Sequence, residues 1–212
     1  MTLSHHPDDA SLASFAAGGS PQNFACVMQL HLDQCDRCRQ RVGQAETLAG
    51  LFFGQQPADR FSAASKSRLM AMLDQPADES PSARPRGTPV PELLRDWSDQ
   101  QVDQLPWRRI APGIKQVRFP EVSGDLYLLR IAPGTCLPEH GHGGGEMTLV
   151  LSGSYSDEIG RFTPGNVADL DDSIEHQPIA DRNRDCICLV ATDAPLRFKD
   201  WAPRLFQRLL NF

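Results

Sequence analysis

Hydrophobic positions in the first third of the chain recur with the three- and four-residue spacing of amphipathic helices. Asp8 and Asp9 are suited to start the first helix, and Gly18 and Gly19 to end it. The apolar positions of this helix and of two later ones are Leu12, Phe15 and Ala16; Phe24, Val27 and Met28; and Val42, Ala45, Leu48, Ala49 and Phe52. Residues 62–73 show the same spacing, so this third of the chain is predicted to be helical.

After residue 91 the pattern changes to short apolar runs typical of β-strands. Four runs rich in valine, isoleucine, leucine and aromatic residues are separated by glycine, proline and aspartate. They are residues 113–120, 125–134, 147–155 and 186–193. Several such runs at close spacing predict a sandwich or a barrel.

A proline-rich segment separates the two patterns. It reads QPADESPSARPRGTPVP, with five prolines in seventeen residues. Such a composition buries little apolar area and favours extended conformations, as linkers do. We therefore predict a helical domain in residues 1–75, a linker in residues 76–91 and an all-β domain in residues 92–212.

Composition and charge restrict the partners and the compartment. The 212 residues carry a net charge of -6, which gives no field that attracts nucleic acid, so an effect on transcription would pass through a protein partner. The start MTLSHHPDDA lacks the basic and apolar regions of a signal peptide, and no run approaches the ~20 apolar residues that span a bilayer. We expect a cytoplasmic protein without membrane contact. Thiols stay reduced there, which favours metal binding over disulfides for the six cysteines.

A histidine and two cysteines lie close together in the segment HLDQCDRC. His31 and Cys35 are four residues apart and would share one face of a helix, and Cys38 would join them as the helix ends. Zinc prefers tetrahedral nitrogen and sulfur ligands, and a Cys-x2-Cys pair is a common half-site. We expect the fourth ligand to be His6 or its neighbour His5.

A redox dithiol and a structural disulfide are the alternatives for this cysteine pair. A redox Cys-x-x-Cys normally sits at a helix N-terminus near a βαβ pattern, whereas this pair is expected late in a helix with a histidine upstream. A helical domain of this size also has little core of its own, so a metal would help to stabilise it. Zinc is therefore the preferred interpretation. Cys26 lies on the apolar stripe and is expected in the core.

The order His6, His31-x3-Cys35-x2-Cys38 in an N-terminal helical region resembles the zinc-binding anti-sigma domain of bacterial ChrR-type anti-sigma factors. The resemblance implies that His6, rather than His5, is the zinc ligand. It also implies that the helical domain binds an extracytoplasmic-function sigma factor and blocks its access to RNA polymerase.

An apolar cluster is wider than one helix stripe and comprises Leu51, Phe52 and Phe53. Part of it would face a protein partner, which helices commonly bind through an apolar face. The alternative is that all three side chains pack the small core.

A second candidate site lies in GTCLPEHGHGGGEMTLVLSG. His140 and His142 are two apart and face one side of a strand, and Glu146, beyond a glycine turn, can return to that face. Two imidazoles and a carboxylate suit zinc, iron, manganese or nickel. His176 lies in a later strand-and-turn segment. Solvated loop histidines are the alternative, but five of the six histidines fall into the two ligand sets.

These residues resemble the first motif of the cupin superfamily, G-x5-H-x-H-x3-E-x6-G, framed by Gly134 and Gly153. The second cupin motif keeps its spacing from Gly165 to His176. Its usual proline, glycine and asparagine are replaced by Asp171, Ser173 and Ala180. The resemblance implies a cupin barrel, a double-stranded β-helix or jelly roll, that holds a divalent metal, for which we expect zinc ahead of manganese, iron or nickel. The implied ligands are His140, His142, Glu146 and His176.

Cys186 and Cys188 are two apart on an expected strand, so both should face the same side. They either line the metal pocket or are small core residues, as free cysteines often are. ChrR-type proteins carry a similar Cys-x-Cys followed by a run like ATDAPLRF, which implies a place in the pocket and a part in sensing. Cys136 is assigned no role.

The order of helical zinc domain, linker and cupin resembles ChrR-type proteins over nearly the whole chain. It implies a non-enzymatic anti-sigma factor that releases its sigma factor when the cupin senses singlet oxygen or organic hydroperoxides. The alternatives are a metal-dependent cupin enzyme, such as a dioxygenase, with an accessory zinc domain, and a scaffold with two structural metals. An enzyme would need acid–base groups beside an open metal position. The nearby acids, which in a turn are more often solvated, are Asp169, Asp171, Asp172 and Glu175.

Overall fold

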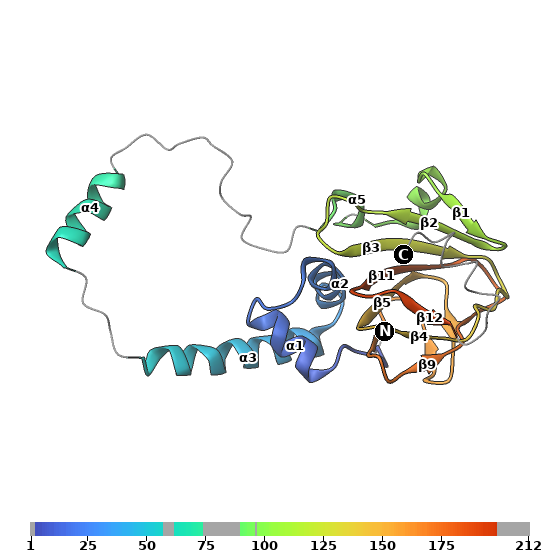
Figure 1. The fold of residues 1–212 in the computed structure, drawn as a ribbon, viewed down its shortest axis with the longest axis horizontal. Helices are drawn as coiled ribbons and strands as arrows, with labels where there is room; N and C mark the ends of the chain where they lie inside the picture. The colour runs from blue at the N-terminus through green and yellow to red at the C-terminus, as the bar shows by residue number, and fades with distance from the viewer. Residues whose placement is uncertain (1–2, 57–61, 74–89, 96, 199–212) are drawn as a thin grey trace.

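The computed structural model describes residues 3–56, 62–73, 90–95 and 97–198, so most of the predicted linker lies outside the described residues (Figure 1). The first part is helical, as predicted. Its helices are α1 (Asp9–Ala16), α2 (Gln22–Leu32), α3 (Asp36–Gly54) and α4 (Ala63–Leu73). Two short helices, α5 (Glu92–Arg95) and the 3-10 helix η1 (Asp99–Gln104), lead into the strands.

The second part is a β-barrel, which confirms the predicted all-β cupin. A six-stranded sheet has the order β1-β2-β3-β11-β5-β8, and two three-stranded sheets have the orders β10-β6-β7 and β12-β4-β9. All strand pairs are antiparallel. The strands are β1 (Arg108–Ala111), β2 (Ile114–Arg118), β3 (Asp125–Ile131), β4 (His140–His142), β5 (Glu146–Ser152), β6 (Tyr155–Ser156), β7 (Arg161–Phe162), β8 (Val167–Leu170), β9 (Glu175–His176), β10 (Ile179–Ala180), β11 (Cys186–Thr192) and β12 (Leu196–Phe198).

Strand β11 is buried along its whole length because both of its faces are covered. Side chains of a strand alternate between the two faces. Ile187 and Leu189 belong to a core that β11 shares with the helices, whereas Cys186, Cys188 and Val190 belong to a core inside the barrel. A strand covered on both faces is apolar throughout rather than alternating.

The helical part packs directly against the barrel. Helix α2 lies on the outer face of the six-stranded sheet, against β11 and β5 (Figure 1). Val27 and Met28 of α2 share a hydrophobic core with Leu149 and Leu189, and each such buried side chain contributes about 1.5–3 kcal/mol. The buried Asn23 donates hydrogen bonds to two carbonyl oxygens at strand ends. The two predicted domains are therefore in contact, while their boundaries stay a prediction.

The helix expected through the HLDQCDRC segment is interrupted, which corrects the prediction. Helix α2 ends at Leu32, and α3 begins after Cys35, its N-cap residue in an extended conformation. In one continuous helix Cys38 would lie about 10 Å along the axis from His31, because each residue rises 1.5 Å. The turn between the helices folds it back toward His31.

The apolar cluster at the end of α3 does not pack in the described core. Leu51, Phe52 and Phe53 are exposed, and the end of α3 projects away from the barrel (Figure 1). Helix α4 lies within the described part of the chain and contains no buried residue. These helices therefore present apolar side chains to solvent.

Candidate metal centres

His6, His31, Cys35 and Cys38 come together in one cluster, whose candidate ligand atoms all lie within 4.8 Å of one another. His6 Nδ1 lies 3.4 Å from the Sγ atoms of both cysteines, and His31 Nε2 lies 3.3 Å from Cys38 Sγ. Tetrahedral zinc, with bonds of about 2.3 Å to sulfur and 2.0–2.1 Å to nitrogen, would place such atoms about 3.5 Å apart. We call this cluster the helical centre, and its spacing fits a tetrahedral ion.

The barrel orients one histidine of the helical centre. His31 Nδ1 lies 2.8 Å from the carbonyl oxygen of Gly165. A carbonyl oxygen only accepts hydrogen bonds, so Nδ1 carries the proton and Nε2 turns its lone pair toward the thiols. Such a partner fixes the tautomer and the ring orientation of a metal-ligating histidine. Sequence reasoning missed this contact, which joins residues 134 positions apart.

The extended segment before α1 brings His6, rather than His5, to the helical centre. The backbone N–H groups of Ser4 and His5 donate to Asn166 Oδ1, at 3.1 and 3.4 Å. The ring of His5 stacks on Phe162, with centroids 4.2 Å apart. His6 and not His5 therefore lies in the helical centre, as the family resemblance implies.

Electrostatics in the helical centre are compatible with a bound cation. Burial lowers the pKa of His31 and of His6, so both imidazoles are neutral and can ligate. Burial and the adjacent Cys35 thiol raise the pKa of Cys38 to about 12. A metal ion deprotonates a thiol that coordinates it, so the raised pKa of Cys38 is compatible with metal binding.

The two cysteines lie at the start of a helix and not near its end. The prediction that the Cys-x2-Cys pair sits late in a helix was wrong, since Cys35 and Cys38 lie at the N-terminal end of α3. A helix N-terminus is where redox pairs are usually found. Two histidines whose ring nitrogens lie beside the thiols form a metal-ligand set, and this geometry favours a metal site over a redox dithiol.

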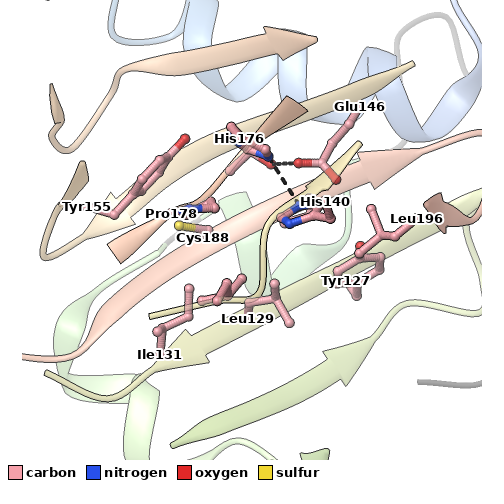
Figure 2. A pocket seen from close by; sticks show the side chains of 13 residues that line it. Tyr127, Leu129, Ile131, His140, Glu146, Tyr155, His176, Pro178, Cys188 and Leu196 are labelled. Atoms are coloured by element: carbon pink, nitrogen blue, oxygen red, sulfur yellow. Dashed lines mark hydrogen bonds between the residues drawn. The ribbon is translucent and has the colours of Figure 1, made fainter. Parts of the chain in front are cut away.

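Three histidines form a second cluster inside the barrel, which we call the cupin centre. His140 and His142 come from β4, and His176 comes from β9, directly opposite His140 in the ladder. His176 Nε2 lies 3.2 Å from His140 Nε2 and 3.3 Å from His142 Nε2. Figure 2 shows His140 and His176 meeting, with Glu146 beside them. Glu146 Oε2 lies 3.4 Å from His142 Nδ1 and outside the three-nitrogen group, so its role as a ligand stays a prediction.

Hydrogen bonds at the outer nitrogens of two of these rings direct their Nε2 atoms toward the centre. His140 Nδ1 lies 2.8 Å from the carbonyl oxygen of Pro138, and His176 Nδ1 lies 2.8 Å from Asp157 Oδ2. Both Nδ1 atoms therefore carry protons, and the two Nε2 atoms face each other across the centre. Two imidazole nitrogens 3.2 Å apart need a positive charge between them, either a proton or a metal ion. Tetrahedral zinc would hold two nitrogens about 3.4 Å apart.

Asp157 is a residue of this site that sequence reasoning missed. Burial raises the pKa of its carboxyl, but hydrogen bonds from His176 and from the backbone N–H groups of Ile159 and Gly160 outweigh burial and hold the pKa below its usual value. The carboxylate is therefore ionised. Burial lowers the pKa of His140 and His142 to about 4, so these imidazoles are neutral at pH 7. A histidine that donates its outer N–H to a carboxylate, as His176 does to Asp157, is a common arrangement in metal sites.

A cavity of about 60 Å³ adjoins the cupin centre, large enough for a few water molecules or one small ligand. Its walls are mainly apolar and include Tyr127, Tyr155 and Cys188. The Sγ atoms of Cys186 and Cys188 lie 3.6 Å apart on one face of β11, but of the described residues only Cys188 of this pair lines the cavity.

The other residues singled out in the sequence lie elsewhere. Cys26 is buried in the core, as predicted, and Cys136 is exposed. The acidic residues that an enzyme would require do not line the described cavity, and Asp171, Asp172 and Glu175 are exposed.

The fold and the two clusters define a class of protein in which helices with a His2Cys2 centre are docked on a cupin barrel with a second centre. Residues 99–195 match the family model described as the ChrR cupin-like domain. Anti-sigma-E factor ChrR of Cereibacter sphaeroides is 38% identical over 209 residues, which cover 98% of each chain. The chain therefore belongs to the ChrR family of anti-sigma factors.

The crystal structure of Rhodobacter sphaeroides SigE in complex with the anti-sigma ChrR matches with a TM-score of 0.72 and 36% identity, covering 91% of this chain and 100% of that chain. An RmlC-like cupin protein from Ralstonia eutropha matches with a TM-score of 0.40 and 22% identity, covering 51% of this chain and 82% of that chain.

Proposed function

We propose that this chain is an anti-sigma factor. Its helical part binds an extracytoplasmic-function sigma factor and withholds it from RNA polymerase in the cytoplasm, until the cupin part responds to an oxidant. The observation that carries the proposal is the identity of 38% over 98% of the chain with a relative named as an anti-sigma factor. The matched crystal structure holds such a relative in complex with its sigma factor.

The exposed apolar helices support a protein partner. Leu51, Phe52 and Phe53 are 62%, 60% and 82% exposed. Helix α4 adds Leu69, Met70, Met72 and Leu73, all more than half exposed. Contiguous exposed apolar side chains of this kind mark interaction sites, and methionine adapts well to a partner surface. The net charge of -6 and the absence of any membrane-spanning helix among the described residues give no support to direct binding of nucleic acid or membrane.

The helical centre is proposed to hold a structural zinc ion through His6, His31, Cys35 and Cys38. Two thiolates and two neutral imidazoles would balance the charge of the ion. All four ligands come from the protein, which is typical of a structural rather than a catalytic zinc site. The ion would fix the extended N-terminal segment against the turn between α2 and α3.

The cupin centre is proposed to hold a divalent metal through His140, His142, His176 and Glu146. These donors suit zinc, which we expect, and are compatible with manganese, iron or nickel. The oxidant, singlet oxygen or an organic hydroperoxide, would act at this metal or at Cys188, with Cys186 beside it. Thiols and histidines are common oxidant targets, and a changed side chain in a packed pocket can bias a two-state element.

Transcription from a sigma-dependent promoter tests the proposal. The full chain, co-expressed with a candidate extracytoplasmic-function sigma factor, should repress that promoter, and His31→Ala should abolish repression. His140→Ala and His176→Ala should repress normally but fail to release the sigma factor under oxidant, whereas the exposed Cys136→Ser should behave as wild type. Normal release by both histidine variants, together with turnover of a small molecule by the purified cupin, would favour the enzyme alternative.

A further inference from the structure

One hairpin of the barrel touches both candidate metal centres. It consists of β6, β7, the turn between them and the turn that follows, and we call residues 155–165 the bridging hairpin. The strands pair through Tyr155 opposite Phe162 and Ser156 opposite Arg161. The connecting turn is closed by the N–H of Asp157, which donates to the carbonyl oxygen of Gly160 at 3.0 Å. The hairpin is therefore a short, hydrogen-bonded unit.

At the cupin centre the hairpin holds the ring of His176. The side chain of Asp157 is fully buried, and its Oδ2 accepts the hydrogen bond from His176 Nδ1. Its Oδ1 accepts from the backbone N–H groups of Ile159 and Gly160, at 2.9 and 3.2 Å. The orientation of His176 is thereby tied to the backbone of the turn. Tyr155, at the start of the same hairpin, lines the cavity.

At the helical centre the hairpin packs against the residue that precedes a ligand. The ring of Phe162 stacks on Tyr155, with centroids 4.8 Å apart, and on His5, with centroids 4.2 Å apart. A Cβ atom at Gly160 would lie 3.0 Å from His5 Cε1, so the turn and the imidazole are in close contact. His5 is joined directly to His6. A shift of the hairpin therefore displaces the segment that carries this ligand.

The last turn of the hairpin reaches the second histidine of the helical centre. The carbonyl oxygen of Gly165 accepts the hydrogen bond from His31 Nδ1. The N–H of Gly165 donates to the carbonyl oxygen of Val150 at 2.9 Å, which anchors the turn to β5. A Cβ atom at Gly165 would lie 2.8 Å from Leu3 Cδ2, so this turn is also packed against the N-terminal segment. Both histidines of the helical centre thus depend on the position of residues 155–165.

We propose that the bridging hairpin couples the two centres, with Asp157 as the positioning residue at the cupin end and Phe162 as the positioning residue at the helical end. The proposal rests on the proposed metal binding at both centres. Loss or alteration of the cupin metal frees the ring of His176 and with it the carboxylate that holds the turn. The hairpin then shifts against His5, and the helical centre exchanges its metal faster. This change alone does not empty the helical centre, so basal repression persists in a chain with an impaired cupin centre.

Substitution of Co²⁺ into the full chain reports on the helical centre separately from the cupin centre. Thiolate-to-Co²⁺ charge-transfer absorption arises only where sulfur ligates, and the cupin centre offers three imidazoles and a carboxylate. The measured quantity is the rate at which this absorption band disappears after EDTA is added. It is compared between the wild-type chain and the His140→Ala chain, in which the cupin centre is weakened. The His140→Ala chain should lose the band about fivefold faster or more, in the usual range of allosteric couplings.

Variants of the bridging hairpin test whether the coupling between the two centres passes through it. Asp157→Asn should weaken metal binding at the cupin centre about 10–100-fold and also speed the loss of the band. In His5→Ala and in Phe162→Leu, adding His140→Ala should no longer change the rate. His5 is only half buried, so His5→Ala removes the stack without opening the core. Ile159→Ala, an exposed position in the same turn, is the control and should keep the wild-type ratio.

Two results would overturn the coupling while both centres bind metal. One is a rate that does not change on His140→Ala in the wild-type background. The other is an equally large change in the His5→Ala and Phe162→Leu backgrounds, which would place the route elsewhere. A full chain that binds no metal at one centre would instead refute the metal assignment of the proposed function, and the coupling with it.

Discussion

The exposed end of α3 gives a direct test of the partner surface. Phe53 is 82% exposed, so Phe53→Ala removes few packed atoms from the free chain. We expect it to change the free energy of unfolding by less than about 0.5 kcal/mol, as surface substitutions usually do. In a complex the same side chain would be covered by the sigma factor. Stability and binding should therefore respond very differently to one substitution.

The size of the binding effect follows from area. A phenylalanine buries about 150–250 Å², and at about 25 cal/mol per Å² the exposed part of Phe53 contributes roughly 3–5 kcal/mol when covered. Alanine keeps some of this contact, and ordering the side chain costs part of the gain. We expect Phe53→Ala to weaken binding by about 2–3 kcal/mol, which is about a 30- to 160-fold rise in Kd.

Titration calorimetry with the purified sigma factor, together with urea denaturation of the free chain, measures both quantities. Ile179→Ala is the matched control, since Ile179 is 46% exposed on β10 and belongs to the barrel. A Kd for Phe53→Ala within twofold of wild type would refute the assignment of this surface. A large loss of stability in the free chain would show that Phe53 packs within the chain itself.

Further predictions concern the cysteines and the docking of α2. Cys35→Ser and Cys38→Ser should each lower the metal content by about one ion per chain, measured by elemental analysis, and an unchanged content would contradict the helical centre. Asn23→Ala removes two buried hydrogen bonds to strand ends, so denaturation should show a loss of about 1–3 kcal/mol, and no loss would mean that this contact does not dock α2. Burial raises the pKa of Cys26 to about 11, which leaves little thiolate at pH 8. Mass spectrometry after iodoacetamide treatment of the folded chain should therefore find label on the exposed Cys136 and none on Cys26.

Part of each cluster could be predicted because local spacing encodes it, whereas His6 and His176 were indicated by the family resemblance. His140 and His142 share a strand face by the two-residue period, and Cys35, at the N-cap of α3, lies three residues before Cys38 in its first turn. The break between α2 and α3 could not be predicted, because the turn contains neither glycine nor proline. The sequence indicates this break only indirectly, because Cys38 cannot reach His31 along one continuous helix.

The contacts that orient the ligands had no signal in the sequence. The hydrogen bond from His176 to Asp157 and the one from His31 to Gly165 depend on how the barrel closes, and no short-range pattern encodes that. The docking of α2 on the barrel, in contrast, is indicated by the sequence of the helix. Its buried residues cover more than one stripe, and a helix apolar on several sides is normally enclosed by other elements. The proline-rich segment nevertheless suggested two separate bodies.

The anchoring of the N-terminal segment has a consequence for how the protein is made. Ser4 is held by Asn166, and the N–H of Asp8 donates to Asp169, across 162 and 161 residues. At about 5–20 residues per second, a ribosome needs roughly 8–30 s to add that much chain. The segment that carries His6 therefore reaches its observed place only after most of the barrel has been synthesised. The segment before α1 therefore stays unfastened while the strands up to β8 are being synthesised.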